Sequence, residues 1–544
     1  MKKSTLSTFF YSILPFLFAV SSCTPEVSKL WEYDSGAWSG TPVVYQGKIY
    51  AANLEGKVFC LDAKTGEELW SYDTGFFPGP SSPCAYKGKI YLGGKYLGEG
   101  SNYPSSKSPG IICLDAVSGE MVWKYDLEKG TESSPAIFDD KVYVGSLDNK
   151  LHCLDAQEGK LLWEFELDEG RFFSGIESPT LVAQGRVYFG GYNGKIYCLD
   201  ATSGEKLWDF TGGTSPLVVV LASPAFYQGK IYVGSYNDKI YCLDSQTGVE
   251  IWNYDSGHII YASPAIYSGK VYGISFREGE PFNEGPAKIF CLDAEEGKVI
   301  WENYFGWDGD YPPIPSIWSL HSSPSIAQGK VFVGSWNGKL YCFDASSGSK
   351  IWEFNTGGGT CSNPILFSGK ILVGSQEGKL YCLDTGDPKV DGWLMFHHDI
   401  EHTGDATGWS MEGTFEKTLT VGDSEINTSE AFSGTIALGG YCFNIGTDLS
   451  GRWSWVIEDE QITGSISDLE IYLVEEIKST FPSYDIDAED LIVVTNEIKS
   501  KVSDGMLLNG TINIRVDGSL NNDEGSPLTV IYVFNGVFSG SIQP

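Results

Sequence analysis

Hydrophobic and polar residues alternate in short runs that recur along most of this chain. In residues 194–208, GKIYCLDATSGEKLW, a run with the period of a β-strand leads into turn-forming residues and then into a second strand-like run. We expect Asp200 to accept hydrogen bonds from the turn amides and Gly204 to supply a positive φ angle. The segment therefore predicts a β-hairpin.

The same hairpin sequence occurs seven more times. Its aspartate follows Cys-Leu, or Cys-Phe once, and stands at Asp62, Asp115, Asp155, Asp200, Asp244, Asp293, Asp344 and Asp384. A tryptophan follows eight residues after all but the last, at Trp70, Trp123, Trp163, Trp208, Trp252, Trp301 and Trp352. Trp31 has the same context without an aspartate before it. Eight copies predict eight structural repeats.

Each repeat also contains two β-rich runs before the hairpin, so the unit has four antiparallel strands, called A to D here. Strand A starts with a small residue and a proline, at Pro42, Pro83, Pro135, Pro179, Pro224, Pro264, Pro324 and Pro364. The spacing runs from 40 residues (Pro224 to Pro264) to 60 (Pro264 to Pro324). A four-stranded unit of this size is typical of a propeller blade, with the strand D tryptophan between blades.

The repeated motif Asp-Ala-x-Ser/Thr-Gly-x-x-x-Trp resembles the tryptophan-docking repeat of the pyrroloquinoline-quinone (PQQ) type β-propellers, and the resemblance covers residues 28–408. The resemblance implies an eight-bladed propeller. This superfamily holds quinoprotein dehydrogenases and also non-catalytic members, such as the lipoprotein scaffold of the outer-membrane β-barrel assembly machine. The resemblance alone therefore leaves both functions open.

The ring needs an outer strand for its last blade. Residues 363–383 supply strands A to C, and the sequence that follows them does not favour a strand. We predict that residues 28–34, with Trp31, form strand D of blade eight and close the ring. Trp393, nine residues after Asp384, is the competing candidate.

The first residues have the pattern of an export signal. A short basic start and an apolar run precede Val-Ser-Ser-Cys23, which resembles the signal of bacterial lipoproteins. We predict a signal peptide at 1–22, lipidation of Cys23 and a tether at 23–27, and hence an exported protein anchored to the bacterial envelope by lipid. An ordinary signal peptide with a chance cysteine is the alternative.

The chain has 12 cysteines, yet eight of them occupy one equivalent strand position. They therefore belong to different blades, and we expect buried thiols rather than disulfides. They are Cys60, Cys113, Cys153, Cys198, Cys242, Cys291, Cys342 and Cys382.

Loop lengths predict which face of the disc binds a partner. A–B and C–D turns lie on one face and stay short, whereas the B–C and D–A loops on the other face carry insertions rich in aromatic residues. We expect residues 306–320, with three prolines, to lie beside the insertion 276–287. The candidate ligand-binding residues are Trp307, Tyr311, Trp318, His321, Arg277, Trp336, Tyr236 and Phe172.

These residue types suit a protein or glycan partner. The formal net charge of −34 argues against nucleic acid. We predict a monomeric, non-catalytic scaffold with no cofactor. The alternative is an enzyme at the axial mouth, such as a quinoprotein oxidoreductase using PQQ with Ca²⁺, although the adjacent cysteine pair typical of those enzymes is absent from the sequence.

Two segments after the last repeat complete the prediction. His397, His398 and His402 are candidate metal ligands, or parts of a segment that packs over blade eight. From residue 409 the repeat ends, and apolar runs separated by Gly, Thr, Ser and Asn predict a β-sandwich at 409–544. The predicted fold is all-β: an eight-bladed propeller at 28–408 followed by this sandwich.

Overall fold

The computed structural model describes two sets of strands. It describes residues 27–34, 36, 40–79, 81–97, 108–168, 175–212, 219–276, 287–306, 322–360 and 362–386. It also describes the backbone of the strands within 408–421, 424–437, 443–445, 449–458, 461–467, 491–503, 507–521 and 527–542. No helix long and apolar enough to cross a membrane occurs in these ranges.

Eight four-stranded antiparallel sheets make up the first set. Blades 1 to 4 contain β2 (Val43–Tyr45), β3 (Lys48–Ala52), β4 (Lys57–Asp62), β5 (Glu68–Asp73); β6 (Cys84–Tyr86), β7 (Lys89–Gly94), β8 (Gly110–Asp115), β9 (Met121–Asp126); β10 (Ala136–Phe138), β11 (Lys141–Gly145), β12 (Lys150–Asp155), β13 (Leu161–Glu166); β14 (Leu181–Ala183), β15 (Arg186–Gly190), β16 (Lys195–Asp200) and β17 (Lys206–Thr211).

Blades 5 to 8 continue in the same order. They contain β18 (Ala225–Tyr227), β19 (Lys230–Gly234), β20 (Lys239–Asp244), β21 (Glu250–Asp255); β22 (Ala265–Tyr267), β23 (Lys270–Ser275), β24 (Ala287–Asp293), β25 (Val299–Phe305); β26 (Ser325–Ala327), β27 (Lys330–Ser335), β28 (Lys339–Asp344), β29 (Lys350–Asn355); and β30 (Ile365–Phe367), β31 (Lys370–Gly374), β32 (Lys379–Asp384) with β1 (Ser28–Asp34).

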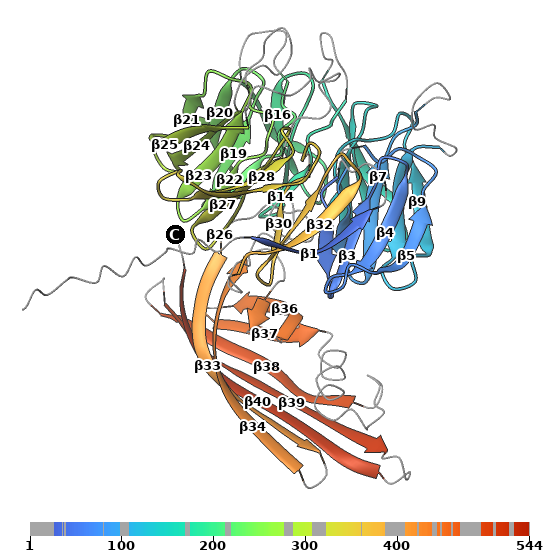
Figure 1. Cartoon of the computed structure of the whole chain (residues 1–544), viewed down its shortest axis with the longest axis vertical. Coiled ribbons are helices and arrows are strands. Elements are labelled where there is room, and N and C mark those ends of the chain that lie inside the picture. The colour runs from blue at the N-terminus through green and yellow to red at the C-terminus, as the bar shows by residue number, and fades with distance from the viewer. Residues whose placement is uncertain are drawn as a thin grey trace, which may run out of the picture.

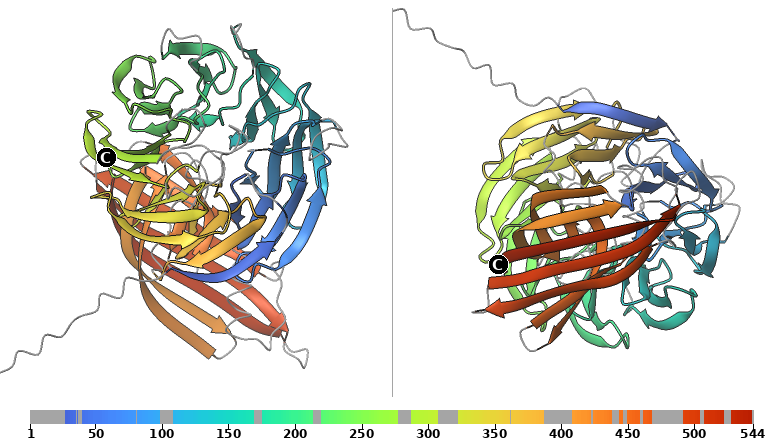
Figure 2. Two further views of the ribbon diagram at one scale, coloured as in Figure 1. Left: turned by 45° about the horizontal axis from the view of Figure 1, so that its top comes forward. Right: turned by 90° about the horizontal axis from the view of Figure 1, so that it is seen from below.

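The blades are arranged in a ring (Figures 1 and 2), and β1 closes it. The sheet order of blade 8 is β1-β32-β31-β30, and Trp31 pairs with Cys382 just as Trp70 pairs with Cys60 in blade 1. The predicted closure by residues 28–34 is therefore confirmed. Trp393 lies outside the described residues, and the outer-strand place it competed for is taken by β1.

Turn chemistry follows the predicted pattern. Every A–B connection has two residues, and both have positive φ, as Gln46 (48°) and Gly47 (69°) do in blade 1. This is the turn type that suits the twist of a tight hairpin. In the C–D turn of blade 4, Asp200 Oδ1 accepts hydrogen bonds from the backbone N–H groups of Thr202 (3.0 Å) and Ser203 (2.8 Å). Gly204 has φ of 74° there, as expected.

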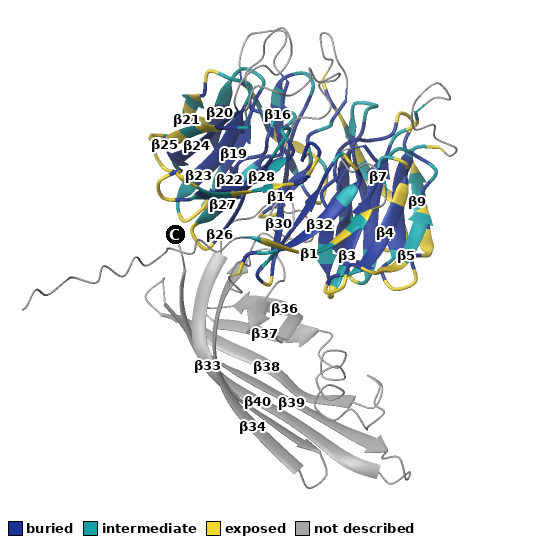
Figure 3. Ribbon diagram, in the orientation of Figure 1, coloured by how far each residue is buried: buried dark blue, intermediate teal, exposed yellow. Residues whose placement is uncertain are grey.

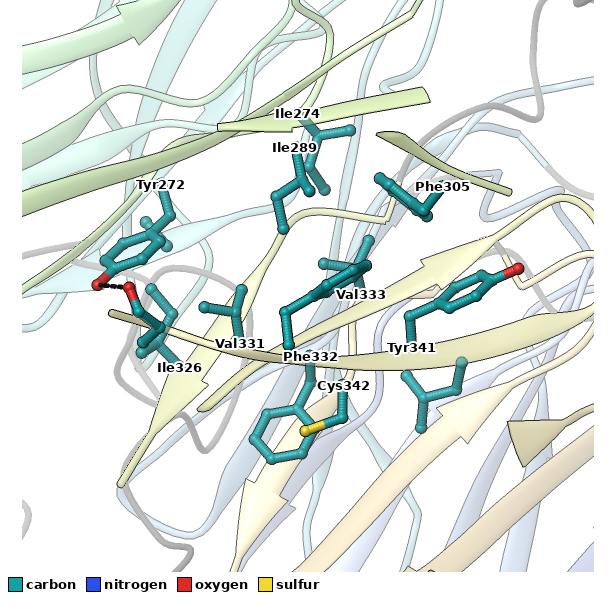
Figure 4. Packing of buried hydrophobic residues seen from close by; sticks show 14 of the residues in the cluster. Tyr272, Ile274, Ile289, Phe305, Ile326, Val331, Phe332, Val333, Tyr341 and Cys342 are labelled. Atoms are coloured by element: carbon teal, nitrogen blue, oxygen red, sulfur yellow. Dashed lines mark hydrogen bonds between the residues drawn. The ribbon is translucent and has the colours of Figure 1, made fainter. Parts of the chain in front are cut away.

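The hydrophobic core lies between neighbouring blades. Figure 3 shows the inner strands buried and the outer strand of each blade largely exposed on one side. In Figure 4, Ile274 and Ile289 of blade 6 pack with Val331 and Val333 of blade 7. The nine cysteines of the described part, eight of them at the predicted repeat position, are free and buried, which confirms their prediction as core residues.

Seven strand D tryptophans, from Trp31 to Trp301, lie against a turn glycine of the next blade. A Cβ added to Gly119 of blade 2 would lie 2.6 Å from the ring of Trp70, so only glycine fits against the indole. The Trp70 indole N–H also donates to the carbonyl oxygen of Ala116 (3.2 Å), and the Tyr50 hydroxyl donates to the same oxygen (3.0 Å). A tyrosine and a tryptophan of one blade are thus fastened to one carbonyl group of the next.

The C-terminal strands form a single eight-stranded sheet in the order β34-β33-β40-β39-β38-β37-β36-β35. Their bounds are β33 (Gly408–Val421), β34 (Ser424–Ala437), β35 (Phe443–Ile445), β36 (Leu449–Glu458), β37 (Gln461–Ser467), β38 (Leu491–Ser503), β39 (Leu507–Asn521) and β40 (Pro527–Ile542). Their pairings are antiparallel. The described strands make one sheet instead of two, so the sandwich and its boundary at 409 stay predictions.

Candidate functional site on the axis of the propeller

The two faces of the disc are separated by their backbone hydrogen bonds. In blade 1 the C–D turn bonds the A–B turn, since the N–H of Ala63 donates to the carbonyl of Gly47 (3.0 Å). On the opposite face the D–A loop bonds the B–C turn, since the N–H of Thr74 donates to the carbonyl of Gly56 (2.8 Å). The face with the predicted binding loops is therefore the B–C and D–A face.

Most predicted ligand-binding residues cannot be placed. Arg277, His321 and Phe172 lie outside the described residues, as do Trp307, Tyr311 and Trp318. Cys23 and the three histidines of the candidate metal site also lie outside them. The predicted contact between residues 306–320 and 276–287 stays a prediction for the same reason.

Tyr236 and Trp336 are placed on the B–C turns of blades 5 and 7. Tyr236 packs edge to face against Tyr261, with ring centroids 5.1 Å apart. Trp336 lies against Gly359, where an added Cβ would be 2.8 Å from the indole ring. Blade 6 separates the two turns, so the structure does not bring these predicted residues into one contact.

A hydrogen-bonded ring surrounds the axis. The residue before the repeated proline carries a side-chain oxygen in all eight blades: Thr41, Ser82, Ser134, Ser178, Ser223, Ser263, Ser323 and Asn363. At six junctions the backbone N–H of this residue donates to that oxygen in the next blade, for example from Thr41 to Ser82 (3.0 Å) and from Asn363 back to Thr41 (3.2 Å). These bonds satisfy backbone groups that the crowded axis would otherwise leave unpaired.

The ring changes its pattern at blade 4. There the hydroxyl of Ser133 donates to the Ser178 carbonyl (3.1 Å), and the hydroxyl of Ser178 donates to the Ala222 carbonyl (3.0 Å). The residue two positions before the proline is glutamate in this blade, Glu177. In the other blades this position holds Gly40, Ser81, Ser133, Ala222, Ala262, Ser322 and Ser362. One carboxyl group thus stands where the fold otherwise uses very small residues.

A second carboxylate lies beside Glu177. Glu132, from the loop between β9 and β10, is only 3 % exposed and forms an ion pair with Lys95 at the end of β7. Burial, followed by the charge and hydrogen bond of Glu132, raises the pKa of Glu177 from 4.5 to about 8. Because two adjacent carboxylates cannot both ionise cheaply, the pair holds a proton near neutral pH.

Tyrosines form the rest of this axial cluster, which we define as Lys95, Glu132, Glu177, Tyr192, Tyr236 and Tyr261. The Tyr192 hydroxyl is hydrogen-bonded to Glu177, and burial together with Glu177 raises the pKa of Tyr192. Burial and Tyr236 likewise raise the pKa of Tyr261. Five neighbouring blades, 2 to 6, contribute these groups.

Sequence reasoning missed the axial carboxylates, although a signal was present. When the repeats are aligned on their eight prolines, the residue two positions before the proline is Gly, Ser or Ala in seven blades and Glu177 in blade 4. Glu132 lies three residues before the proline of blade 3, Pro135. Across the described ranges, no group of three His, Cys, Asp or Glu side chains could hold a metal ion. The described residues therefore offer no set of three acidic, imidazole or thiol ligands for the Ca²⁺ ion that would accompany PQQ.

Similarity to known proteins supports the propeller. Residues 20–101, 107–280, 193–303 and 285–391 match the family of outer membrane protein assembly factor BamB. The quinohemoprotein alcohol dehydrogenase of Comamonas testosteroni is 28% identical over 131 residues, which are 22% of this chain and 18% of that protein. BamB of Xanthomonas campestris is 31% identical over 117 residues, 20% of this chain and 28% of that protein.

BamB of Moranella endobia is 25% identical over 134 residues, 23% of this chain and 33% of that protein. The matched segments thus span a third or less of the length of these three relatives.

Solved structures agree in fold. BamB from Moraxella catarrhalis superposes with a TM-score of 0.53 at 17% identity, over 66% of this chain and 100% of its own. The Comamonas testosteroni dehydrogenase gives 0.54 at 16% identity, over 67% of this chain and 77% of its own. At such identities the likeness concerns the fold alone. Since the family match covers more than half of the 544 residues, this protein belongs to the PQQ-repeat propeller family described as outer membrane protein assembly factor BamB.

Proposed function

We propose that this protein is an exported, lipid-anchored scaffold whose propeller holds a protein or glycan partner at the cell envelope without catalysing a reaction. The main observation in support of this proposal is that variation in loop length is confined to one face of the disc. All eight A–B turns have two residues, whereas B–C connections range from 336–338 to 95–109 and D–A connections from 35–42 to 306–324. Variable loops on a rigid scaffold are a common basis of binding.

The family supports this proposal. The relatives from Moranella endobia and Xanthomonas campestris are named outer membrane protein assembly factors, which is a role in protein assembly at an envelope membrane. In this proposal Cys23 carries the lipid, residues 23–27 are the tether, and the protein acts as a monomer. Arg277, His321, Phe172 and the loop tryptophans would then face the partner.

Photocrosslinking in native envelopes tests the face assignment. Tyr96, on the B–C and D–A face of blade 2, is 50% exposed, and Val117, on the C–D turn of the same blade, is 68% exposed. A benzophenone side chain inserts into C–H bonds of either a protein or a glycan. With this side chain at Tyr96 we expect a discrete crosslinked product, and at Val117 we expect none. Products from Val117 alone would show that the A–B and C–D face binds the partner instead.

A quinoprotein dehydrogenase is the second candidate, because quinohemoprotein alcohol dehydrogenases match the repeats as well as the assembly factors do. Adding PQQ with Ca²⁺ to the purified protein and recording absorbance and alcohol oxidation tests it. A tight chromophoric complex with activity would replace the scaffold proposal. Unchanged spectra and no oxidation would support the scaffold.

A further inference from the structure

With both carboxyl groups ionised, the axial cluster would carry more negative than positive charge. Lys95 can neutralise one of the two carboxylates, and it pairs with Glu132 through Oε1. The other oxygen, Glu132 Oε2, is buried and accepts no hydrogen bond from an N–H group or a hydroxyl group in the described part of the chain, which leaves the protonated Glu177 carboxyl as its candidate donor. The Glu177 carboxyl is hydrogen-bonded to the Glu132 carboxyl. When Glu177 is ionised this oxygen has no donor in the described part of the chain, and because a buried carboxylate oxygen without a donor is costly, it marks a place for a proton or another cation.

The surroundings of this oxygen fit an organic cation better than a metal ion. Tyr192, Tyr236 and Tyr261 supply aromatic surface beside the carboxylates, and each keeps part of its side chain exposed to solvent. Aromatic rings next to carboxylates favour alkylammonium and guanidinium groups. A divalent metal would need further oxygen ligands, and Lys95 would repel its double charge more strongly than the single charge of an organic cation.

We propose that Glu132 and Glu177, lined by Tyr192, Tyr236 and Tyr261, form a binding site for one alkylammonium or guanidinium group. Its N–H groups donate to Glu132 Oε2 and to the Glu177 carboxylate, in place of the proton that the pair shares. That proton leaves to solvent, so the site exchanges one monocation for another. The titratable groups around it are those of the axial cluster. The site does not depend on which partner the loops bind.

Calorimetric titration of the full-length protein tests the site, with n-butylammonium chloride as the free amine and an acetylated, amidated tripeptide with central lysine as the polypeptide source. Ionic strength is held constant with sodium chloride. We expect binding to release up to about one proton near pH 7, and affinity to rise by up to about tenfold per pH unit until Glu177 is ionised. Titrations in buffers of different ionisation enthalpy measure the released proton.

The decisive variant is Glu177→Gln, because glutamine has the shape of the protonated carboxyl and should preserve the fold. We expect it to weaken binding of both probes about tenfold or more and to abolish proton release. Glu166→Gln, an exposed acid on β13, is the matched control and should leave both unchanged. Tighter binding of the tripeptide than of butylammonium identifies a polypeptide source, and the reverse identifies a free amine.

Three results would overturn the proposal. They are no heat at millimolar probe, equal affinity of the wild type and Glu177→Gln, and binding without proton release at neutral pH. If CaCl₂ binds with proton release while neither amine does, the cluster is a metal site and the proposal is also wrong. None of these results bears on the loop face, which the crosslinking experiment tests separately.

Discussion

Substituting Trp31 by alanine probes the closure of the ring. Trp31 belongs to β1, which pairs with β32 and also touches blade 1. Its indole covers Gly66, where an added Cβ would lie 2.6 Å from the ring, and Tyr33 packs on Phe59 with centroids 5.5 Å apart. The substitution therefore removes the largest side chain that joins the last blade to the first.

The expected cost follows from the buried area. A tryptophan buries roughly 150–250 Å², which at about 25 cal/mol per Å² gives about 4–6 kcal/mol for full burial. Trp31 is only partly buried, and its indole N–H has no acceptor among the described residues, so no hydrogen bond is lost. We expect Trp31→Ala to lower the free energy of unfolding by about 2–3 kcal/mol. Deleting residues 24–35 also removes the β1–β32 ladder and should cost more.

Urea denaturation followed by far-ultraviolet circular dichroism measures this cost. Leu30→Ala is the matched control, because Leu30 precedes Trp31 in the same strand and is 46% exposed. The control should change the free energy of unfolding by no more than about 0.5 kcal/mol. If Trp31→Ala behaves like the control and the deletion also leaves the midpoint unchanged, β1 does not hold the ring closed and the reasoning is wrong.

Three further measurements test other parts of the structure. Gly204→Ala adds a Cβ 2.6 Å from the Trp163 ring, at a position with φ of 74°. Gly185→Ala is the control, because Gly185 has a similar φ (71°) and open space around an added Cβ. Thermal unfolding should show a loss of stability of about 1 kcal/mol for the control and clearly more for Gly204→Ala. The pKa of Glu177 is higher in the folded protein than in the unfolded chain, so Glu177 stabilises the fold fully below pH 4.5, and this stabilisation is lost as the pH rises toward 8. Glu177→Gln should therefore reduce the fall in the free energy of unfolding that urea denaturation measures between these pH values. Burial raises the pKa of the Cys153 thiol to about 12, so this thiol and its repeat equivalents should react with a disulfide reagent only after unfolding, whereas fast reaction of the native protein would contradict their burial.

The propeller could be predicted because the sequence of each repeat determines the local structure of its own blade. The aspartate, glycine and tryptophan of one hairpin fix a turn and an inter-blade contact, and the eightfold recurrence excludes a chance match. The orphan Trp31 fixed the closing strand, since its context matched the other strands D. The inter-blade bonds of Tyr50 and its equivalents were not predicted, although tyrosine recurs at this position in six repeats.

The candidate site could be predicted only in part. The sequence indicated correctly which loops share a side of the disc, because strand order decides this, and the choice of the binding face stays a prediction. It did not find Glu132 and Glu177, because their meeting depends on the ring placing residues from different blades around one axis. Local patterns cannot show that neighbourhood. Comparing equivalent positions across the repeats would have singled out Glu177, since a carboxyl replaces Gly, Ser or Ala there.

The interface that closes the ring lacks both the tyrosine and the tryptophan hydrogen bond, which blades 1, 2, 4, 5 and 6 each make to the next blade. In blade 8 the strand B tyrosine is replaced by Leu372, and the Trp31 indole N–H has no acceptor among the described residues. Closure thus depends on packing, on the β1–β32 ladder, on the axial hydrogen bond from Asn363 to Thr41 and on the hydrogen bond from the Tyr33 hydroxyl to Glu68. β1 begins at Ser28, five residues after the proposed lipid anchor at Cys23. Tension on that anchor would therefore act first on the strand that holds the propeller closed.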